Sequence, residues 1–306
     1  MAAFALSAGW VSGSVIDEQD AATVACGDAC ATPSATPRAG GQRLAIAAPK
    51  APPSTPEPSD LPYIDADYVA VIEGGCGAMI FGRNEHKQFP PASLTKLMTA
   101  AVATDQASVD TMITSDVDGE LLHEETGSSY MGLKPGMQLS LLDLLYGLLL
   151  PSGNDAAIAI AKGISGSEGA FVDLMNAKAK DLALDDTHFT NAHGLYEDGL
   201  HSSAIDMAVL ARYVMRNADL RQIVASASWQ PRWDGGQVWN GNAFLTQYPG
   251  ADGVKIGFTE ESKQTIVASA TRDGRRIIAA LMNSDDRYTD AERLMDWAFD
   301  QPSSCP

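Results

Sequence analysis

Two hydrophobic patterns alternate along the chain after residue 62. Short apolar runs bounded by Gly, Asp or Pro predict β-strands, whereas apolar positions spaced three and four apart predict amphipathic helices. Asp273-Gly274 joins two of the short runs and is a strong hairpin signal. We expect strands at 68–72, 78–81, 253–259, 265–270 and 276–281.

The helical pattern fills the middle of the chain, about 94–220. An apolar helix starts after Ser93, and Ser140, Ser167 and Ser203 each precede a further apolar run, as helix-capping residues do. Residues 156–161 continue the helical pattern beyond a turn. A capping box, Thr289-x-x-Glu292, predicts a last helix that starts at Thr289.

Strands at both ends around a helical middle predict one antiparallel five-stranded sheet flanked by helices and interrupted by a helical insertion. This is an α+β fold within the broad α/β class. In the domain 63–300, the sheet part comprises 63–92 and 240–300, the insertion comprises 93–239, and 301–306 form a short tail. The last helix should cover the sheet. The helix that follows Ser93 then begins where sheet and insertion meet, a place where clefts commonly form.

Residues 1–62 lack the pattern of a packed core. Within them, 31–60 are rich in Pro, Ala, Ser and Thr and predict a disordered, partly extended linker. Residues 1–16 are small and apolar and resemble the end of a secretory signal. No Lys or Arg precedes Arg38, so an unstructured N-terminus is the alternative. No later stretch reaches the ~18 apolar residues of a membrane span.

Charge and cysteine content bear on partners and compartment. Asp and Glu number 39 against 21 Lys and Arg, a net charge of −18 without a basic cluster, so no nucleic-acid partner is expected. The cysteines show no zinc-binding spacing, and no metal is expected. Cys26 and Cys30 could close a small loop, and Cys76 and Cys305 could pair. The four allow three connectivities, and the sequence does not choose between them.

Candidate chemistry begins at Ser93-Leu94-Thr95-Lys96. The prolines at 90 and 91 disfavour helix before Ser93, which should therefore lie near a helix N-terminus with Lys96 one turn on. A Ser hydroxyl becomes a good nucleophile when a neighbouring base takes its proton, and a Lys amine can be that base if burial lowers its pKa. Alone, this spacing also fits a helix-capping Ser beside a solvated Lys.

Two further short motifs carry polar groups next to a glycine. In Ser152-Gly153-Asn154, a sharp turn presents a hydroxyl and an amide, although a plain polar turn between helices would look the same. In Lys255-Ile256-Gly257, a Lys lies on a predicted strand where Gly allows close backbone approach by a ligand. A sheet Lys beside a packing Gly is the alternative.

In combination, the three motifs resemble the active-site set of penicillin-binding proteins and serine β-lactamases. Longer stretches narrow the resemblance to the low-molecular-mass, serine-type D-alanyl-D-alanine carboxypeptidases. It covers about 64–299 and is carried by 91–96, 143–156, 191–195 and 248–255. It implies a β-lactamase/DD-peptidase-like fold, an exported enzyme without a cofactor, peptidoglycan stem peptides ending in D-Ala-D-Ala as substrates, and β-lactams as inhibitors.

The resemblance also implies roles for individual residues. Ser93 would form the acyl-enzyme, Lys96 would be its general base, and Ser152 would relay a proton to the leaving amine. Asn154 would bind the substrate peptide and hold Lys96. Lys255 would add positive potential near the substrate carboxylate. The backbone N–H groups of Ser93 and Phe258 would form the oxyanion hole.

The end of the cleft that holds the substrate carboxylate departs from the family pattern. The third motif is usually Lys-Thr-Gly, but Ile256 stands where the Thr hydroxyl would meet the carboxylate, next to Gly257. Thr259, two residues after Gly257, or Arg287 could compensate. In relatives an Arg shortly before the last helix binds this carboxylate, and Arg287 stands in a similar place. A solvated loop Arg is the alternative for Arg287.

Other polar residues are given structural roles. His193 is read as structuring its loop, because Lys96 already fills the role of base. Glu124 and Glu125 are expected in solvent. The alternative functions are a serine β-lactamase or DD-endopeptidase of the same fold and, from another class, a penicilloyl-binding protein without turnover, which Ile256 favours. The Glu-x-x-Leu-Asn setting of class A β-lactamases is not found in the sequence.

Overall fold

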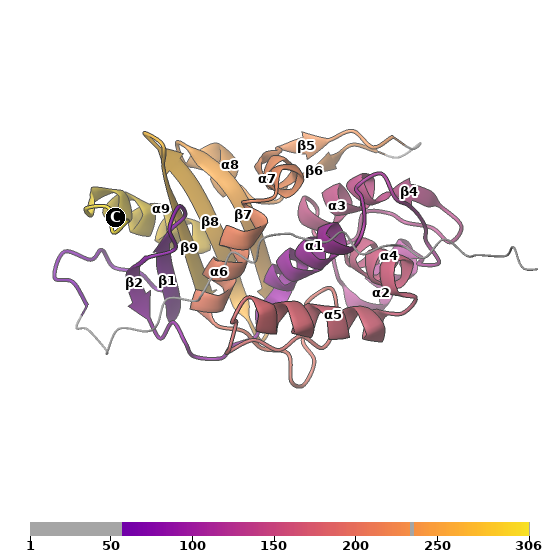
Figure 1. Ribbon diagram of the computed structural model, residues 1–306, viewed down its shortest axis with the longest axis horizontal. Coiled ribbons are helices and arrows are strands. Elements are labelled where there is room, and N and C mark those ends of the chain that lie inside the picture. Colours follow the sequence, from indigo (N-terminus) through magenta and orange to yellow (C-terminus); the bar gives the residue numbers. More distant parts are fainter. Residues whose placement is uncertain (1–56, 233–235, 306) are drawn as a thin grey trace, which may run out of the picture. The chain divides into compact units, whose positions relative to one another are not determined.

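The main sheet is assembled from the two ends of the described chain. The computed structural model describes residues 57–232 and 236–305. Within them, an antiparallel sheet has the spatial order β2-β1-β9-β8-β7 (Figure 1). All five predicted strands and the predicted α+β fold are confirmed. The strands are β1 (Tyr68–Glu73), β2 (Met79–Arg83), β7 (Ala251–Thr259), β8 (Lys263–Arg272) and β9 (Arg275–Ser284).

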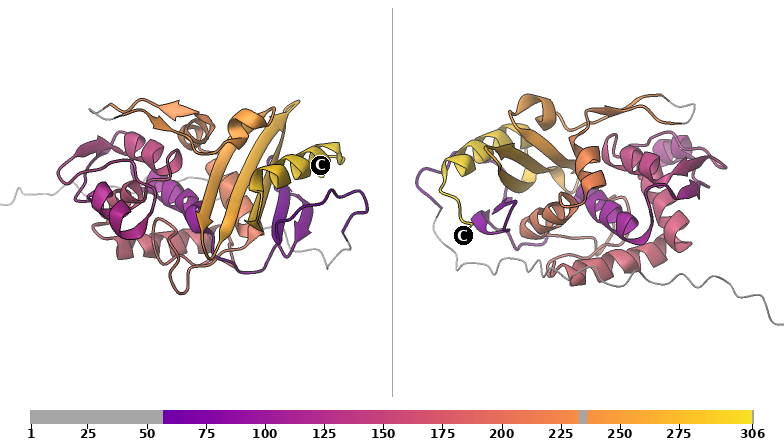
Figure 2. Two further views of the ribbon diagram at one scale, coloured as in Figure 1. Left: turned by 180° about the vertical axis from the view of Figure 1, so that it is seen from behind. Right: turned by 45° about the horizontal axis from the view of Figure 1, so that its top comes forward.

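Both faces of the sheet are covered, and for this reason its central strands are apolar along most of their length. In β1, Val69 and Val71 join an apolar cluster with α9 (Arg287–Asp300). Ala70 and Ile72 point to the opposite face and join the core of the helical region. Figures 1 and 2 show α9 on one face of the sheet and α6 on the other, so the predicted covering helix is confirmed.

The start of α9 corrects one prediction. The helix begins at Arg287, and its N-cap is Asp286, whose side chain accepts a hydrogen bond from the backbone N–H of Thr289. Thr289 is therefore inside the first turn, and its hydroxyl donates to Asp286 Oδ2 at 2.7 Å. An Asp accepts the N–H bonds of a first turn well and also suits the positive end of the helix dipole, which explains why the cap falls three residues earlier than predicted.

The three predicted helix caps in the middle of the chain are confirmed. Each Ser side chain accepts a hydrogen bond from the backbone N–H three residues on: Ser140 from Asp143, Ser167 from Ala170, and Ser203 from Asp206. The predicted helices are η1 (Ala92–Leu94) running into α1 (Thr95–Gln106), α3 (Leu141–Leu149), α4 (Asn154–Ser165), α5 (Glu168–Asp181) and α6 (Ala204–Val214).

Several short elements were not predicted. Three are helices, and four are strands of two or three residues, too short for a hydrophobic period to show. The strands pair β3 with β4 and β5 with β6. The elements are α2 (Gly119–Thr126), α7 (Ala218–Ala225), α8 (Phe244–Gln247), β3 (Met112–Thr114), β4 (Gln138–Ser140), β5 (Ser228–Trp229) and β6 (Val238–Trp239).

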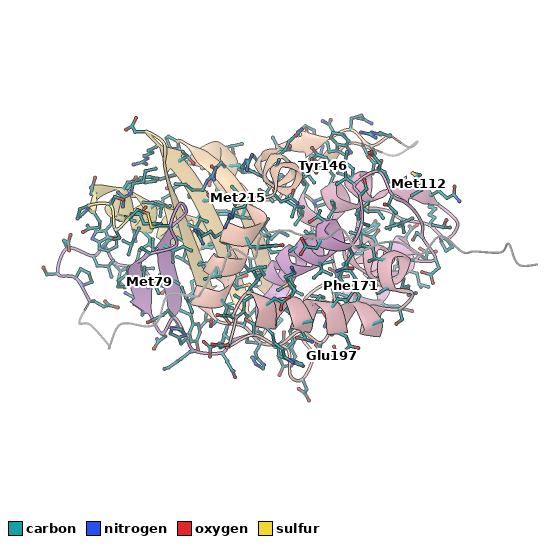
Figure 3. All side chains as sticks on the ribbon, in the orientation of Figure 1. Met79, Met112, Tyr146, Phe171, Glu197 and Met215 are labelled. Carbon is teal, nitrogen blue, oxygen red and sulfur yellow. A yellow bond between two sulfur atoms is a disulfide. The ribbon has the colours of Figure 1, made fainter. Side chains whose placement is uncertain are left out.

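Helix α1 is the centre of the helical region. All nine residues from Thr95 to Ala103 are buried, because the helices α3, α4, α5 and α6 surround α1. Six of these nine residues are apolar, and the other three are Thr95, Lys96 and Thr99, which are polar yet fully buried. Phe171 of α5 and Tyr146 of α3, both labelled in Figure 3, belong to the same core. The path of α1 through the core carries Lys96 into the interior.

A disulfide joins the end of the described chain to the turn after β1. Cys76 and Cys305 are bonded, with their Cα atoms 5.8 Å apart. Hydrogen bonds hold the same segment: Ser304 N donates to Glu73 Oε1 at 3.1 Å, and Arg275 donates to the carbonyl of Gln301 at 2.7 Å. The structure thus chooses one of the pairings that the sequence left open, while Cys26 and Cys30 lie outside the described residues.

Contacts at the N-terminal side begin just before the predicted domain start at residue 63. The Trp297 indole donates to Asp60 Oδ2 at 3.1 Å, and Leu61 packs against the cluster between the sheet and α9. The predictions for residues 1–56, including the signal-like segment and most of the linker, fall on residues that the structure does not describe. Among the described helices, none combines the length and the apolar composition needed to cross a bilayer.

Candidate active site

Ser93 and Lys96 come together because both lie where η1 runs into α1. Ser93 is in the 3₁₀ turn, and Lys96 is one turn on, in the buried part of the helix. Lys96 Nζ lies 3.1 Å from Ser93 Oγ, and the Lys96 side chain has no exposed surface. The structure therefore differs from a capping Ser beside a solvated Lys, which was the alternative from the sequence.

Two further oxygen atoms surround the Lys96 amine. Lys96 Nζ donates to Asn154 Oδ1 at 2.7 Å and to the backbone carbonyl of His193 at 2.6 Å. Asn154 is the first residue of α4, directly after the Ser152-Gly153 turn. His193 belongs to a loop in which its ring Nδ1 accepts from Leu195 N at 3.1 Å. The His193 ring thus holds its loop, as expected, and the carbonyl of the same residue contacts Lys96.

Burial and neighbouring charges set the protonation of these groups. Burial and the positive charge of Lys255 hold the pKa of Lys96 well below its usual value, and the negative charge of Asp155 opposes this shift. Burial and then the charge of Arg287 lower the pKa of Lys255 to about 7. Burial and the charge of Lys96 lower the pKa of His193 to about 3, so its ring is neutral near pH 7.

Ser152 is held in an unusual backbone conformation. Its φ of +67° lies in the left-handed region, which is uncommon for a residue with a side chain. Its Oγ is buried and has no hydrogen-bond partner among the described residues, although Ser152 lines the cleft. An unpaired buried hydroxyl at a strained position is typical of a functional site rather than of a stabilising turn.

Strand β7 passes directly against the turn that carries Ser93. Gly257 has no room for a side chain, and Phe258, the next residue, has a side chain that is 54 % exposed. Thr259 also lines the cleft, but its hydroxyl donates to Ser262 Oγ at 2.9 Å. Lys255 on the same strand is buried, and its Nζ donates to the carbonyl of Ile256 at 3.0 Å.

Arg287 lies at the same end of the cleft as Ile256. The Arg287 side chain donates to the backbone carbonyls of Gly257 at 2.6 Å and Thr265 at 3.1 Å, and to Gln264 Oε1 at 3.0 Å. It is therefore not a solvated loop residue: the first residue of α9 is fixed against β7 and β8. Ile256, which lines the cleft beside it, has no side-chain donor.

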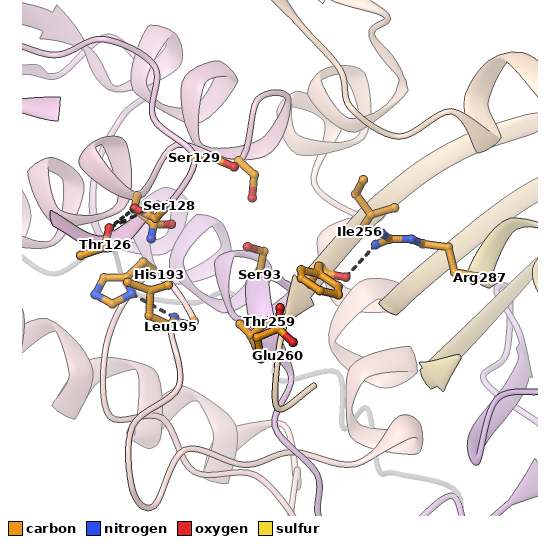
Figure 4. Close-up of a pocket in the computed structure, with 16 residues that line it drawn as sticks. Ser93, Thr126, Ser128, Ser129, His193, Leu195, Ile256, Thr259, Glu260 and Arg287 are labelled. Carbon is orange, nitrogen blue, oxygen red and sulfur yellow. Dashed lines mark hydrogen bonds between the residues drawn. The ribbon is translucent and has the colours of Figure 1, made fainter. Parts of the chain in front are cut away.

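These residues surround one cleft of about 480 Å³. Figure 4 shows Ser93 in the middle of the cleft, with Ile256 and Arg287 on one side and His193 and Leu195 on the other. The buried amines of Lys96 and Lys255 lie behind the cleft surface. The cleft is lined by Ser93, Thr126, Gly127, Ser128, Ser129, Ser152, Asn154, His193, Gly194, Leu195, Ile256, Gly257, Phe258, Thr259, Glu260 and Arg287.

One wall of the cleft was missed in the sequence. Thr126, the last residue of α2, and residues 127–129 after it line the cleft although they lie in none of the recognised motifs. Their only local signal is the Gly127 helix end, with φ +66°. Glu124 and Glu125 in α2 are exposed, as predicted. Across residues 57–232 and 236–305, no three His, Cys, Asp or Glu side chains are grouped to hold a metal ion.

Comparison with known proteins identifies the family of this chain. The S11 peptidase family model, described as D-alanyl-D-alanine carboxypeptidase, matches residues 54–286, and the chain therefore belongs to this family. D-alanyl-D-alanine carboxypeptidase DacF of Bacillus subtilis is 34% identical over 79% of this chain and 64% of the relative. DacD of Escherichia coli is 36% identical over 80% of this chain and 65% of the relative. The chain thus spans just under two thirds of the length of these two relatives.

Solved structures show the same fold. The Streptomyces K15 DD-transpeptidase superimposes with a TM-score of 0.73 at 29% identity, over 78% of this chain and 98% of that chain. D-alanyl-D-alanine carboxypeptidase from Mycobacterium tuberculosis H37Rv gives a TM-score of 0.74 at 32% identity, over 83% of this chain and 98% of that chain. The DD-peptidase-like fold implied by the motifs is therefore confirmed.

Proposed function

We propose that this protein is a serine D-Ala-D-Ala carboxypeptidase that removes the terminal D-alanine from peptidoglycan stem peptides and is acylated by penicillins. Membership of the family supports the reaction class. The proposal rests on one observation: the buried Lys96 amine contacts three oxygen atoms, Ser93 Oγ, Asn154 Oδ1 and the backbone carbonyl oxygen of His193.

The three neighbours of Lys96 support a neutral amine that acts as a base. A neutral primary amine has two N–H donors and one lone pair. Asn154 Oδ1 and the His193 carbonyl can only accept, so they take both N–H groups and leave the lone pair for the Ser93 hydroxyl. The lowered pKa of Lys96 favours this form. Lys96 then takes the proton as Ser93 attacks.

Acylation forms one bond and breaks another. Ser93 Oγ bonds to the carbonyl carbon between the two D-alanines, and the backbone N–H groups of Ser93 and Phe258 stabilise the negative oxygen. The C–N bond then breaks, and Ser152 passes the proton from Lys96 to the leaving amine. The unpaired Ser152 hydroxyl at the cleft supports this role. Water hydrolyses the resulting ester and restores Ser93.

The remaining residues bind the substrate. Asn154 contacts its peptide group, and Gly257, which also lines the cleft, lets β7 lie close to the turn of Ser93. Lys255 supplies positive potential behind this strand. At the far end, Thr259 and Arg287 remain to meet the terminal carboxylate, because Ile256 cannot donate a hydrogen bond. All of these steps use protein groups and water, and no cofactor enters them.

We place this activity outside the cytoplasm, at the cell wall. The disulfide between Cys76 and Cys305 supports export, because disulfides persist in oxidising compartments. The proposed substrate, peptidoglycan, also lies outside the cytoplasm.

The test combines turnover with covalent labelling. Purified protein incubated with a D-Ala-D-Ala-terminated peptide should release D-alanine, and a fluorescent penicillin should attach to Ser93, as located by mass spectrometry. Ser93→Ala should lose both activities. Ser167→Ala, which removes only the cap of α5, should keep both. Labelling of Ser93→Ala at the wild-type rate would contradict the assignment.

One alternative has an observation in its favour. Ile256 removes a donor from the carboxylate end, which favours a penicilloyl-binding protein without turnover. That protein would be labelled by the penicillin but would release no D-alanine. A serine β-lactamase would instead hydrolyse the penicillin rapidly, and a DD-endopeptidase would cleave cross-linked stem peptides as well.

A further inference from the structure

Asp155 is a buried carboxylate that the proposed mechanism does not use. The side chain has no exposed surface, although a carboxylate is costly to bury. It accepts hydrogen bonds from the backbone N–H groups of Met131 at 2.9 Å, Gly132 at 3.0 Å and Leu133 at 2.9 Å. A fourth bond, also 2.9 Å, comes from Ala156 in its own helix. Four backbone donors from two segments thus converge on one side chain.

Two glycines leave the space that this carboxylate occupies. A Cβ on Gly119, the first residue of α2, would lie 2.4 Å from Asp155 Oδ2. A Cβ on Gly153 would lie 2.7 Å from Asp155 Oδ1. The start of α2, the segment 131–133 and the start of α4 therefore meet at Asp155.

The segments joined at Asp155 form part of the cleft. Residues 126–129, which run from the last residue of α2 towards the segment bound by Asp155, line it. Asn154 N donates to the carbonyl of Ser129 at 2.8 Å, and Gly119 N donates to the carbonyl of Leu133 at 2.8 Å. The Asn154 side chain in turn contacts Lys96. Displacement of Asp155 would therefore shift the 126–129 wall of the cleft and, through Asn154, the position of the Lys96 amine.

We propose that Asp155 is a positioning residue for the acylation of Ser93, which holds the 126–133 segment and the start of α4 in place and supplies a buried negative charge near Lys96. This inference rests on the proposed function. Asp155 touches neither Ser93 nor Lys96 through a hydrogen bond. It acts through Asn154 and through its charge.

The charges around Lys96 give this role a distinct signature. Lys255 from β7 lowers the pKa of Lys96, whereas Asp155 from α4 raises it. His193, whose carbonyl contacts the amine, has a ring that stays neutral above its pKa of about 3. Removal of the Asp155 charge should therefore lower the pKa of Lys96 further. The active base would then persist to lower pH, which loss of packing alone would not produce.

The experiment uses two variants of the full chain to separate the positioning role of Asp155 from the effect of its negative charge on Lys96. The measurement is the rate of acylation by a fluorescent penicillin between pH 4 and 9. Asp155→Asn should lower the maximal rate about 10- to 100-fold and move the acid limb of the profile to lower pH. Gly119→Ala displaces the carboxylate but keeps its charge, so the maximal rate should fall about tenfold with the acid limb unchanged.

The control is Asp143→Asn. Asp143 is also buried and accepts hydrogen bonds from Ser140 Oγ and the Trp229 indole, but it does not contact the cleft wall. This variant should be less stable to heat and should keep the wild-type pH profile.

The outcomes separate the inference from the proposed function. If the wild-type protein is not acylated on Ser93, the proposed function fails and the inference fails with it. If the wild type is acylated and Asp155→Asn keeps its rate and its acid limb, only the inference is overturned. Where Asp155→Asn does not fold, Gly119→Ala decides: a tenfold loss supports positioning, and a rate within twofold of wild type overturns it.

Discussion

A β-carbon at position 257 would lie 2.9 Å from the backbone nitrogen of Ser93, closer than side chains approach backbone in folded proteins. It would also lie 2.6 Å from Thr265 Oγ1 on the neighbouring strand. Glycine at this position therefore allows backbone contact between β7 and the turn that carries Ser93. The proposed oxyanion hole needs this contact, because one donor comes from Ser93 and the other from Phe258.

Gly257→Ala should separate β7 from η1 and draw the two donors apart. Loss of one oxyanion donor typically costs about 10²–10³-fold, and we expect a decrease of this size in the acylation rate. Gly169→Ala is the matched control, because a Cβ at that position meets open space. An acylation rate for Gly257→Ala within threefold of wild type would show that the oxyanion donors lie elsewhere.

Lys96→Met should remove the proposed general base while filling a similar volume. Acylation should fall by about 10²–10⁴-fold or more, since removal of an activating base commonly has this effect. Lys162→Met, at an exposed pair with Asp116, should acylate normally. Near-normal labelling of Lys96→Met by a fluorescent penicillin would assign the proton transfer to another group.

The rate of acylation should depend on pH through both lysines. In the proposed mechanism Lys96 acts when deprotonated, so the rate should rise as pH increases through its lowered pKa. Lys255 is proposed to act when protonated, so the rate should fall above its pKa of about 7. In Lys255→Met, loss of the positive charge raises the pKa of Lys96, so the acid limb should move to higher pH and the alkaline limb should disappear. A flat profile between pH 6 and 10 in the wild type would argue against a Lys base.

Ile256 and Arg287 test how the substrate carboxylate is held. A hydrogen bond to a charged acceptor is worth about 1.5–3 kcal/mol, or roughly ten- to a hundredfold in kcat/KM. Ile256→Thr should therefore increase D-alanine release unless Arg287 already satisfies the carboxylate. If Arg287 does so, Arg287→Ala should lower kcat/KM severely in the wild type. The same substitution should lower kcat/KM less in the Ile256→Thr background. If both single variants and the double variant had the kcat/KM of the wild type, neither residue would contact the substrate carboxylate.

Deletion of residues 1–56 should leave the enzyme active. Their composition cannot build a core, and this deletion keeps Asp60 and Leu61, with which the described contacts to α9 on this side of the chain begin. We expect kcat/KM for a D-Ala-D-Ala peptide within about twofold of the full chain. A tenfold loss would mean that the deleted segment takes part in forming the cleft.

Sequence could predict those parts of the fold that depend on local signals. The alternation of apolar residues and the caps at Ser140, Ser167 and Ser203 are read from a few neighbouring positions. The capping residue of α9 was misplaced because Asp286 and Thr289 both suit a helix start; Asp is the better cap, and the packing of Arg287 against the sheet fixes the first turn there.

The candidate site likewise has a part that local sequence predicts and a part that depends on segments distant in the sequence. Ser93 and Lys96 are one helical turn apart, so their meeting follows from spacing. The 126–129 wall and its attachment to Asp155 depend on segments that are distant in sequence, and no local pattern indicates them. The partner of Cys76 is 229 positions away and could be found only from the structure.

The bond between Cys76 and Cys305 makes residues 76–305 a covalent ring. A single cut by a protease in any exposed loop of this ring would open it without releasing a fragment. Ser93, near one end of the ring, and Lys255, near the other, would remain tethered. Nicked protein should therefore migrate as one band until it is reduced, and its two pieces could stay assembled around the cleft.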